Sequence, residues 1–368
     1  MNNSTIYKYT PKKSLDFVLK TFNFQKTGKM ARFDIIHNLG IVEYCTGVKP
    51  TKKNLFYLIK KTCDELLDLT FLYPESDPEK KKFTWNGFIF QQDWWTSWII
   101  KRPFSDLKGL KEYVLREIEE LNNWKSGESW DWWMKWYVED YRVYYIQATK
   151  PMRHVTTIYA VSPVALDVVM HRAGVELFWY LYYDDPDLVK KWLDSYINHE
   201  IMRINDIADV TLCPIALVDC DIAYKNGLIA SPEFLKKEFF PRLKKIIETW
   251  HKHNYKVIYH SDGFVWNVMG ELIKAGIDAI HPIDVTSGMN IIKLREEYPN
   301  LVLIGGIDSI GLLALGTPRK IEKEIVKIIT TIGQTEGIFL GSSIEIDPSS
   351  KLENIISIDK TLKKFRLR

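Results

Sequence analysis

Short apolar runs alternate with longer amphipathic stretches along most of the chain. Eight of the runs are rich in β-branched and aromatic residues and end at polar residues, glycine or proline, which is typical of buried strands. They are ARFDI (31–35), LDLTFLY (67–73), VTTIYAV (155–161), VTLCPIALVD (210–219), YKVIYH (255–260), IDAIHP (277–282), LVLIGG (301–306) and GIFLGS (337–342). The pattern therefore predicts eight strands, most of them separated by helices.

Two of the amphipathic stretches carry helix start signals. SPEFLKKEFFPRLKKIIETWHKH opens with a capping serine, Ser231, followed by proline and glutamate, and TPRKIEKEIVKIITTI repeats that order at Thr317 and Pro318. Repeated strand-then-helix units favour a parallel sheet, and eight of them predict a single (β/α)8 TIM barrel of the α/β class over residues 1–368. A doubly wound open sheet is the alternative, but no GxGxxG motif follows the first strand.

Residues 76–150 interrupt the alternation between the second and third predicted strands. This segment holds nine of the 13 tryptophans and combines a β-rich part, FTWNGFIF, with a helical part, LKGLKEYVLREIEELNNW. We interpret it as a Trp-rich insertion whose tryptophans either pack internally or at a subunit interface, or line an aromatic-rich pocket. Trp94, Trp95 and Trp98 are the candidates for contacting substrate, because QQDWWTSW combines polar and aromatic side chains.

Composition and charge exclude several classes of partner. The 368 residues are 46% hydrophobic and 26% charged, as in an ordinary globular protein, and a net charge of +3 gives no field for nucleic acid. The four cysteines form no CxxC pair, the N-terminus lacks the apolar core of a signal peptide, and no run reaches the ~20 apolar residues of a membrane helix. We expect a soluble cytoplasmic protein with no membrane partner; a homodimer is one candidate state.

Polar residues gather where the predicted strands stop, and active sites of TIM barrels lie at the carboxyl ends of their strands. A single aspartate there is more often a helix cap or turn former, His281 before Pro282 can be a buried structural histidine, and a glycine pair can simply permit a tight turn. The coincidence over several strands nevertheless indicates a site. Its members are Asp34, Asp219, Cys220, Asp221, His260, Ser261, Asp262, His281, Gly305, Gly306, Asp308, Ser342, Ser343 and Glu345.

Four motifs in the C-terminal half, in the same order, resemble the uroporphyrinogen decarboxylase superfamily. They are DIAYKNGLIASPEFLKKEFFPRLKKI, VIYHSDGFV…LIKAGIDAIHPI, LVLIGGIDSIGLLALGTPRKIEKEI and GIFLGSSIEI…LENI, within about residues 210–356, while RFD at 32–34 stands at the first strand. The resemblance implies a (β/α)8 barrel. The superfamily includes heme-pathway decarboxylases and corrinoid-dependent methyltransferases that act on methanol, methylamines, methylthiols or methoxylated aromatics.

The sequence departs from the patterns of both branches. The decarboxylases have an arginine-rich segment of the type RQAGR, but MARFDIIHNLG contains only Arg32, a poor match for a substrate with eight carboxylates. The methyltransferase branch commonly binds zinc through His-x-Cys and a later cysteine. Here Asp262 stands in the cysteine position after His260, and no thiol occurs among Gly341, Ser342 and Ser343. Because zinc accepts carboxylate oxygen, a site of His260, Asp262 and one of Asp219, Cys220 or Asp221 is chemically feasible, with metal-free substrate binding as the alternative.

The resemblance therefore implies a methyltransferase that moves a methyl group from a small O-, N- or S-methyl compound, such as a methoxylated aromatic, to a corrinoid-binding partner protein. The alternatives are decarboxylation of a tetrapyrrole or related acid, and a non-catalytic ligand-binding barrel. The predicted catalytic residues are His260, Asp262, Asp219, Asp221 and Tyr224, and the predicted metal ligands are His260, Asp262 and Cys220. The predicted substrate-binding residues are Asp34, Arg32, Trp94, Trp95, Trp98, His281, Gly305, Gly306, Asp308, Ser342, Ser343 and Glu345.

Overall fold

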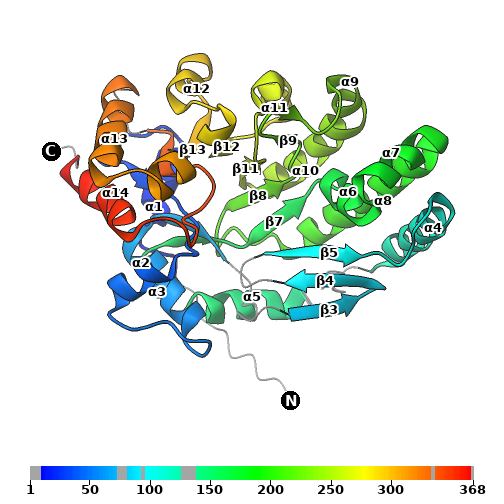
Figure 1. Ribbon diagram of the computed structural model, residues 1–368, viewed down its shortest axis with the longest axis horizontal. Coiled ribbons are helices and arrows are strands. Elements are labelled where there is room, and N and C mark those ends of the chain that lie inside the picture. The colour runs from blue at the N-terminus through cyan, green and yellow to red at the C-terminus, as the bar shows by residue number, and fades with distance from the viewer. Residues whose placement is uncertain (1–9, 73–80, 93–95, 126–137, 333–335, 366–368) are drawn as a thin grey trace.

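The computed structural model describes residues 10–72, 81–92, 96–125, 138–332 and 336–365 (Figure 1). Its main feature is a seven-stranded sheet in which every neighbouring pair is parallel. In spatial order the strands are β1 (Ala31–Arg32), β14 (Ile338–Ser342), β13 (Val302–Ile307), β12 (Ala279–Ile283), β11 (Lys256–His260), β8 (Ile215–Asp219) and β7 (Ala160–Pro163). A further parallel pair consists of β2 (Leu69–Phe71) and β6 (Thr156–Ile158).

Each of the eight predicted strand positions is a strand in the structure, which confirms the parallel α/β fold. The third position forms two strands, β6 and β7, with only Tyr159 between them. An isolated parallel bridge between Phe33 and Leu69 connects the end of β1 to β2. This arrangement is consistent with a TIM-like barrel.

Helices lie around the outside of the strands (Figure 1). The α-helices associated with the parallel strands are α1 (Leu15–Phe22), α2 (Leu39–Thr46), α3 (Leu55–Leu66), α6 (Leu166–Ala173), α7 (Val175–Asp184), α8 (Pro186–Ile207), α9 (Pro232–Phe234), α10 (Phe240–Lys252), α11 (Met269–Ala275), α12 (Ile291–Glu297), α13 (Pro318–Ile332) and α14 (Leu352–Lys364). Shorter turns are η1 (Leu235–Phe239), η2 (Trp266–Val268), η3 (Val285–Ser287) and η4 (Ser309–Ala314). Among the helices of the described residues, none is long and apolar enough to cross a membrane.

Both predicted helix starts are confirmed. The Ser231 hydroxyl accepts a hydrogen bond from the Phe234 backbone N–H at 3.1 Å, and α13 begins at Pro318. Strands β12, β13 and β14 are buried along their whole length, because each is covered on both faces. At Gly341 a Cβ atom would lie 1.8 Å from the Phe33 carbonyl oxygen, so only glycine lets β1 approach β14 this closely.

Between β2 and β6 the chain forms a separate antiparallel sheet of β3 (Lys81–Trp85), β4 (Phe88–Gln92) and β5 (Ser97–Lys101), followed by α4 (Leu107–Asn123) and α5 (Val138–Ala148). The turn from β3 to β4 has positive φ at both Asn86 (45°) and Gly87 (78°), as a tight hairpin requires. The predicted β-rich and helical parts of residues 76–150 are thus both present. Trp94 and Trp95 lie outside the described residues.

Candidate active site at the carboxyl ends of β8 and β11

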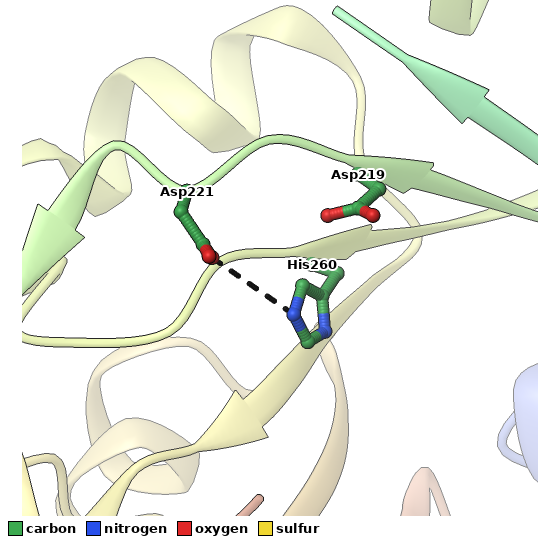
Figure 2. A group of neighbouring side chains, drawn as sticks. All are labelled: Asp219, Asp221 and His260. Atoms are coloured by element: carbon green, nitrogen blue, oxygen red, sulfur yellow. Dashed lines mark ion pairs between the residues drawn. The ribbon is translucent and has the colours of Figure 1, made fainter. Parts of the chain in front are cut away.

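The last residues of two neighbouring strands form the centre of the site. Asp219 ends β8, His260 ends β11, and the two are direct partners in the parallel register. Asp221 follows two residues after Asp219, and Figure 2 shows the three side chains gathered at this end of the strands. One ligand atom from each of Asp219, Asp221 and His260 lies within 4.8 Å of the other two. These carboxylates and the histidine are therefore brought together at the carboxyl ends of two parallel strands.

Hydrogen bonds between the loop after β8 and the loop after β11 hold these side chains in place. The Asp262 backbone N–H donates to Asp221 Oδ1 at 2.7 Å, and the Cys220 N–H donates to the His260 carbonyl at 3.1 Å. The Ser261 hydroxyl accepts from the Ile222 N–H at 3.0 Å. Because each loop satisfies polar groups of the other, neither can move without breaking several hydrogen bonds, and the site is preorganised.

Gly263 allows the loop after His260 to pass close to the backbone of Ala223 and Tyr224, which follow β8. It has a φ of 91°, and a Cβ atom there would lie 2.6 Å from the backbone of Ala223 and Tyr224. Those two residues are β9 (Ala223–Tyr224), which pairs with β10 (Gly227–Leu228) in a small hairpin. The hairpin presents Tyr224, a predicted catalytic residue, with 52% of its surface exposed beside the site.

His260 and the carboxylates around it shift one another's pKa values. Its Nε2 atom lies 3.9 Å from Asp221 Oδ1 and 3.9 Å from Asp262 Oδ1. Burial raises the pKa of Asp262 to about 6, although the charge of His260 acts to lower it. Burial also raises the pKa of Asp219. Burial alone would lower the pKa of His260, but the charges of Asp219, Asp262 and Asp221 outweigh it and raise this pKa. The cluster therefore favours a positive charge at His260.

Asp167 is a site residue that the sequence reasoning missed. It lies in the first turn of α6, just after β7, with its carboxyl group near the buried Cys220 thiol. Burial and then the charge of Asp219 raise the pKa of Asp167 to about 7, so its carboxyl group is substantially protonated near neutrality. Its position after VTTIYAVSP, at a carboxyl strand end, is the signal that could have found it.

A cavity of about 760 Å³ opens beside this group. Asp167, Asp221 and Tyr224 line one side, and the antiparallel sheet lines the other with Trp85, Phe88, Phe90 and Ile99. The remaining lining residues include Arg102, His171 and Arg172. Trp98, on β5, is 43% exposed and is not among the lining residues. The described tryptophan that faces the cavity is therefore Trp85.

His281, predicted to bind substrate, lies directly behind His260. The two Nδ1 atoms are 2.7 Å apart, and His281 is fully buried. Its ring meets the Phe33 ring edge-on at 4.8 Å between centroids. Burial, and then the charge of His260, hold the pKa of His281 well below its usual value, so this histidine is neutral.

The other predicted residues after β1 and β14 pair with one another. Asp34 is buried and accepts hydrogen bonds from the Ser342 hydroxyl at 2.6 Å and the Ser342 N–H at 3.1 Å. Burial, partly offset by Ser342, raises the pKa of Asp34 to about 6. Glu345 lies 2.9 Å from Nδ1 of His37, a residue the sequence reasoning did not select. These pairs form a second polar group at the same end of the sheet.

The remaining predicted residues, Asp308, Gly305, Gly306, Ser343 and Arg32, take part in local structure. Asp308 accepts hydrogen bonds from the Ile310 and Gly311 N–H groups, so its carboxylate caps the η4 turn. Gly305 and Gly306 have φ angles of 110° and 97°, which only glycine adopts readily. Ser343 accepts a hydrogen bond from the Ser309 N–H. Arg32 is buried and pairs with Asp359 of α14, in the outer helix layer.

The donor set at Asp219, Asp221 and His260 fits a divalent cation. It offers one imidazole nitrogen and carboxylate oxygens, all of which zinc accepts, and contains no thiolate. Asp262 Oδ1, beside His260, is a buried atom with no hydrogen-bond partner among the described residues, which is costly unless another group uses it. Cys220 is not part of this group, so the geometry favours the two aspartates over Cys220 as companions of His260.

The known proteins that this chain resembles are methyltransferases, in agreement with the sequence motifs. No family model matches the chain. Two relatives are methylcobamide:CoM methyltransferases MtbA, one from Methanosarcina mazei (23% identity over 180 residues, 47% of this chain and 49% of the relative) and one from Methanosarcina acetivorans (24% over 181 residues, 48% and 50%). The chain thus spans about half the length of the curated relatives it matches.

A solved structure extends the likeness in fold to nearly the whole chain. A methyltransferase from Methanosarcina mazei superposes with a TM-score of 0.62 and 14% identity, covering 96% of this chain and 99% of that one. At this identity the match establishes the fold. The curated relatives, which are named as methylcobamide methyltransferases, agree with the resemblance of this chain to corrinoid-dependent methyltransferases.

Proposed function

We propose that this protein is an enzyme that transfers a methyl group between a small molecule and a corrinoid carried by a partner protein. The observation that carries the proposal is the convergence of Asp219, Asp221 and His260 at the carboxyl ends of adjacent strands, in a fold shared with a methyltransferase. The small molecule is an O-, N- or S-methyl compound, and transfer to the corrinoid is the direction that the sequence favours.

The same site would hold a metal ion through His260 Nε2 and the carboxylates of Asp219 and Asp221, with Asp262 beside them. Such an ion supplies Lewis-acid chemistry at the heteroatom that carries the methyl group. The loops after β8 and β11 keep the donor atoms together before the ion binds, since each loop is hydrogen-bonded to the other. Zinc is our first candidate, and the carboxylate-rich donor set also suits cobalt or manganese.

Asp167 is placed to supply a proton. A methyl group that passes to a corrinoid leaves both bonding electrons on its former heteroatom, and that atom becomes a poor leaving group unless it gains a proton. Asp167 lines the cavity together with Asp221, and its pKa of about 7 keeps it protonated at and below neutral pH. We assign it the role of general acid, with Tyr224 at the rim of the cavity as the alternative proton donor.

The cavity favours a flat, partly apolar methyl donor. Trp85, Phe88 and Phe90 give one wall the aromatic character that suits stacking against a ring. A volume of about 760 Å³ is in the range of small-molecule sites. A methoxylated aromatic is therefore the donor that we favour over methanol or a methylamine, both of which would leave most of this wall without contacts.

The names of the curated relatives favour a second candidate reaction. In those proteins the methyl donor is a methylcobamide and the acceptor is coenzyme M, which is the opposite direction of transfer. In this chain the same residues would then serve a thiol acceptor, and Asp167 would have to accept a proton instead of donating one. Decarboxylation of a polycarboxylate is a weaker alternative, because Arg32 pairs with Asp359 and Arg102 donates to the carbonyls of His171 and Arg172.

We further propose that the strands close into a (β/α)8 barrel. The pairing of β2 with β6, the continuity of β6 with β7, and the bridge from Phe33 to Leu69 supply the contacts that closure requires. Residues 76–150 would then be an elaboration that covers one side of the barrel mouth, since the β3–β5 sheet shares a cavity with Asp167 and Asp221.

The test is a methyl-transfer assay in both directions. The zinc-loaded protein is incubated with free cob(I)alamin and a panel of methoxylated aromatics, methylamines and methylthiols, and separately with methylcobalamin and coenzyme M. Formation or loss of methylcobalamin is followed by its absorbance. We expect turnover with a methoxylated aromatic. Turnover only with coenzyme M would establish the second candidate, and turnover in neither direction would contradict the proposal.

A further inference from the structure

The geometry points to His281 as a positioning residue that holds the His260 ring in the protonation pattern that a metal ligand needs. The inference rests on the metal site of the proposed function and deepens it. His260 has two ring nitrogens, and they face different surroundings. Nε2 faces the carboxylates of Asp221 and Asp262 at 3.9 Å, whereas Nδ1 faces Nδ1 of His281 at 2.7 Å.

A separation of 2.7 Å between two ring nitrogens requires one proton between them. Two protons would clash, and none would leave two lone pairs facing each other. If the proton belongs to His260, the Nε2 atom is the one that can present a lone pair to a metal. If it belongs to His281, a neutral His260 must carry its own proton on Nε2, where that proton blocks the site. The donor of this one hydrogen bond therefore decides whether His260 can be a ligand.

The surroundings of the two rings assign the proton to His260. The carboxylates of Asp221 and Asp262 lie 3.9 Å from Nε2 of His260 and favour a proton or a cation at that atom, which leaves Nδ1 of His260 to donate to His281. His281 is fully buried, and its ring lies edge-on to Phe33 and Phe71, with centroids 4.8 Å and 6.0 Å away. Apolar surroundings disfavour a charge on His281, so His281 accepts at Nδ1 and carries its single proton on Nε2.

The unpaired Nε2 atom of His281 indicates that a histidine is present here for a functional reason. It is buried and has no hydrogen-bond partner among the described residues. An unpaired buried N–H group destabilises a folded protein, and an aromatic ring without polar atoms would fill this space between Phe33 and Phe71 at no such cost. Of the two ring nitrogens of His281, Nδ1 is the one with a hydrogen-bond partner among the described residues, and such a ring would lack this acceptor.

The backbone holds the two rings in register. His260 and His281 are direct partners in the parallel pairing of β11 with β12, and the Ser261 N–H donates to the His281 carbonyl at 3.0 Å. Metal-binding histidines in proteins usually donate their second N–H to a carboxylate or a carbonyl. Here a second histidine takes that place, on a strand whose position relative to His260 is fixed by the sheet.

Two matched variants test the inference. In His281→Asn the side-chain oxygen stands near the position of Nδ1 and can still accept, whereas His281→Phe fills the space and cannot. Metal-free proteins are titrated with Zn²⁺ against a competing chelator, and thermal unfolding without metal shows that each variant is folded. We expect His281→Phe to bind Zn²⁺ about 10–100-fold more weakly than the wild type, and His281→Asn to stay close to the wild type.

NMR spectroscopy of ¹⁵N-labelled histidines shows directly which ring nitrogens of His260 and His281 carry a proton. In ¹⁵N-histidine-labelled, zinc-loaded wild-type protein, His260 should show a protonated Nδ1, and His281 should show a protonated Nε2 with a bare Nδ1. Equal Zn²⁺ affinity of wild type and His281→Phe, or a proton on Nδ1 of His281, would overturn the inference and leave the proposed function standing. Failure of the wild type to bind Zn²⁺, Co²⁺ or Mn²⁺ would instead remove the metal site of the proposed function.

Discussion

Asp34 is buried and Asp167 is partly buried, and both have carboxyl groups with raised pKa values, yet their neighbours give them different roles. Asp167 lines the cavity and contacts Cys220, whereas Asp34 is held by the Ser342 hydroxyl and N–H. Asp167 can therefore contact a substrate in the cavity, whereas the Asp34 carboxylate is already hydrogen-bonded within the protein. The two residues therefore allow one prediction about catalysis and one about stability.

Replacing Asp167 with asparagine tests the general acid. The wild-type rate of methyl transfer to cob(I)alamin should fall as the pH rises through about 7, because the protonated carboxyl group is the active form. Asp167→Asn should lower kcat by roughly 10²–10⁴-fold and remove this dependence on pH. The measurement is a pH profile of kcat. An unchanged alkaline decline in the variant would show that another group, such as Tyr224, supplies the proton.

Asp34 should make the protein less stable as the pH rises. Its pKa is about 6 in the folded protein, against an ordinary pKa of 3.8, so from about pH 4 to 6 the unfolded chain ionises while the folded protein keeps its proton. Stability from this group is complete below pH 4 and is lost as the pH passes 6, a change of roughly 3 kcal/mol. Asp34→Asn should flatten this part of the curve of unfolding free energy against pH. A curve unchanged by the substitution would show that Asp34 ionises equally in both states.

At the scale of elements, the site depends on how closely the loops after β8 and β11 pass each other. Gly263 has a positive φ and lies against the backbone of Ala223 and Tyr224. By contrast, a Cβ atom added at Gly270 in α11 would meet no other atom within 4 Å, and the φ of Gly270 is not positive. The two glycines form a matched pair for the same substitution.

Gly263→Ala should destabilise the protein by about 1–3 kcal/mol or more, because the added methyl group has no room beside the β9 backbone. It should also weaken Zn²⁺ binding, since the His260 loop and the β9–β10 hairpin must separate. Gly270→Ala should be neutral or stabilising by up to about 1 kcal/mol. Denaturant unfolding and Zn²⁺ titration measure both effects. Equal behaviour of the two variants would contradict the proposed packing.

The sequence predicted these elements well because each parallel strand is an apolar run that stops at polar residues. It also predicted that His260 and Asp262 would lie near one of Asp219, Cys220 or Asp221, since parallel strands place their carboxyl ends at one edge; in the structure Asp219 and Asp221 are the residues grouped with His260. It missed Asp167, whose strand continues to Pro163, beyond the end expected at residue 161. It also could not show that Asp308 caps its own turn or that Arg32 faces Asp359, because both depend on local geometry that strand spacing does not carry.

For the whole molecule, the important relation is between the parallel sheet and the antiparallel sheet beside it. The cavity lies between them, with Asp167 and Asp221 on one side and Trp85, Phe88 and Phe90 on the other. The sequence predicted aromatic substrate contacts in residues 76–150, but which tryptophan faces the cavity depends on the register of β3, β4 and β5. Trp85 lines the cavity, and Trp98 does not.

Binding of a methoxylated aromatic should therefore quench tryptophan fluorescence through Trp85. Trp85→Phe should lose most of the quenching and keep an aromatic wall, whereas Trp98→Phe, at an exposed position outside the cavity lining, should retain it. A fluorescence titration with each variant measures this. Quenching that persists in Trp85→Phe but disappears in Trp98→Phe would place the ligand elsewhere.

The measurement that tests the central claim most directly is the rate of methyl transfer as metal is added back to metal-free protein. In the wild type, with free cob(I)alamin and a methoxylated aromatic or with methylcobalamin and coenzyme M, the rate should rise to a plateau at about one metal ion per chain, the capacity of a single three-ligand site. His260→Ala should neither bind that metal nor gain activity. A metal-free protein as active as the loaded one, or a His260→Ala variant that keeps both metal and rate, would contradict the assignment of the β8–β11 site.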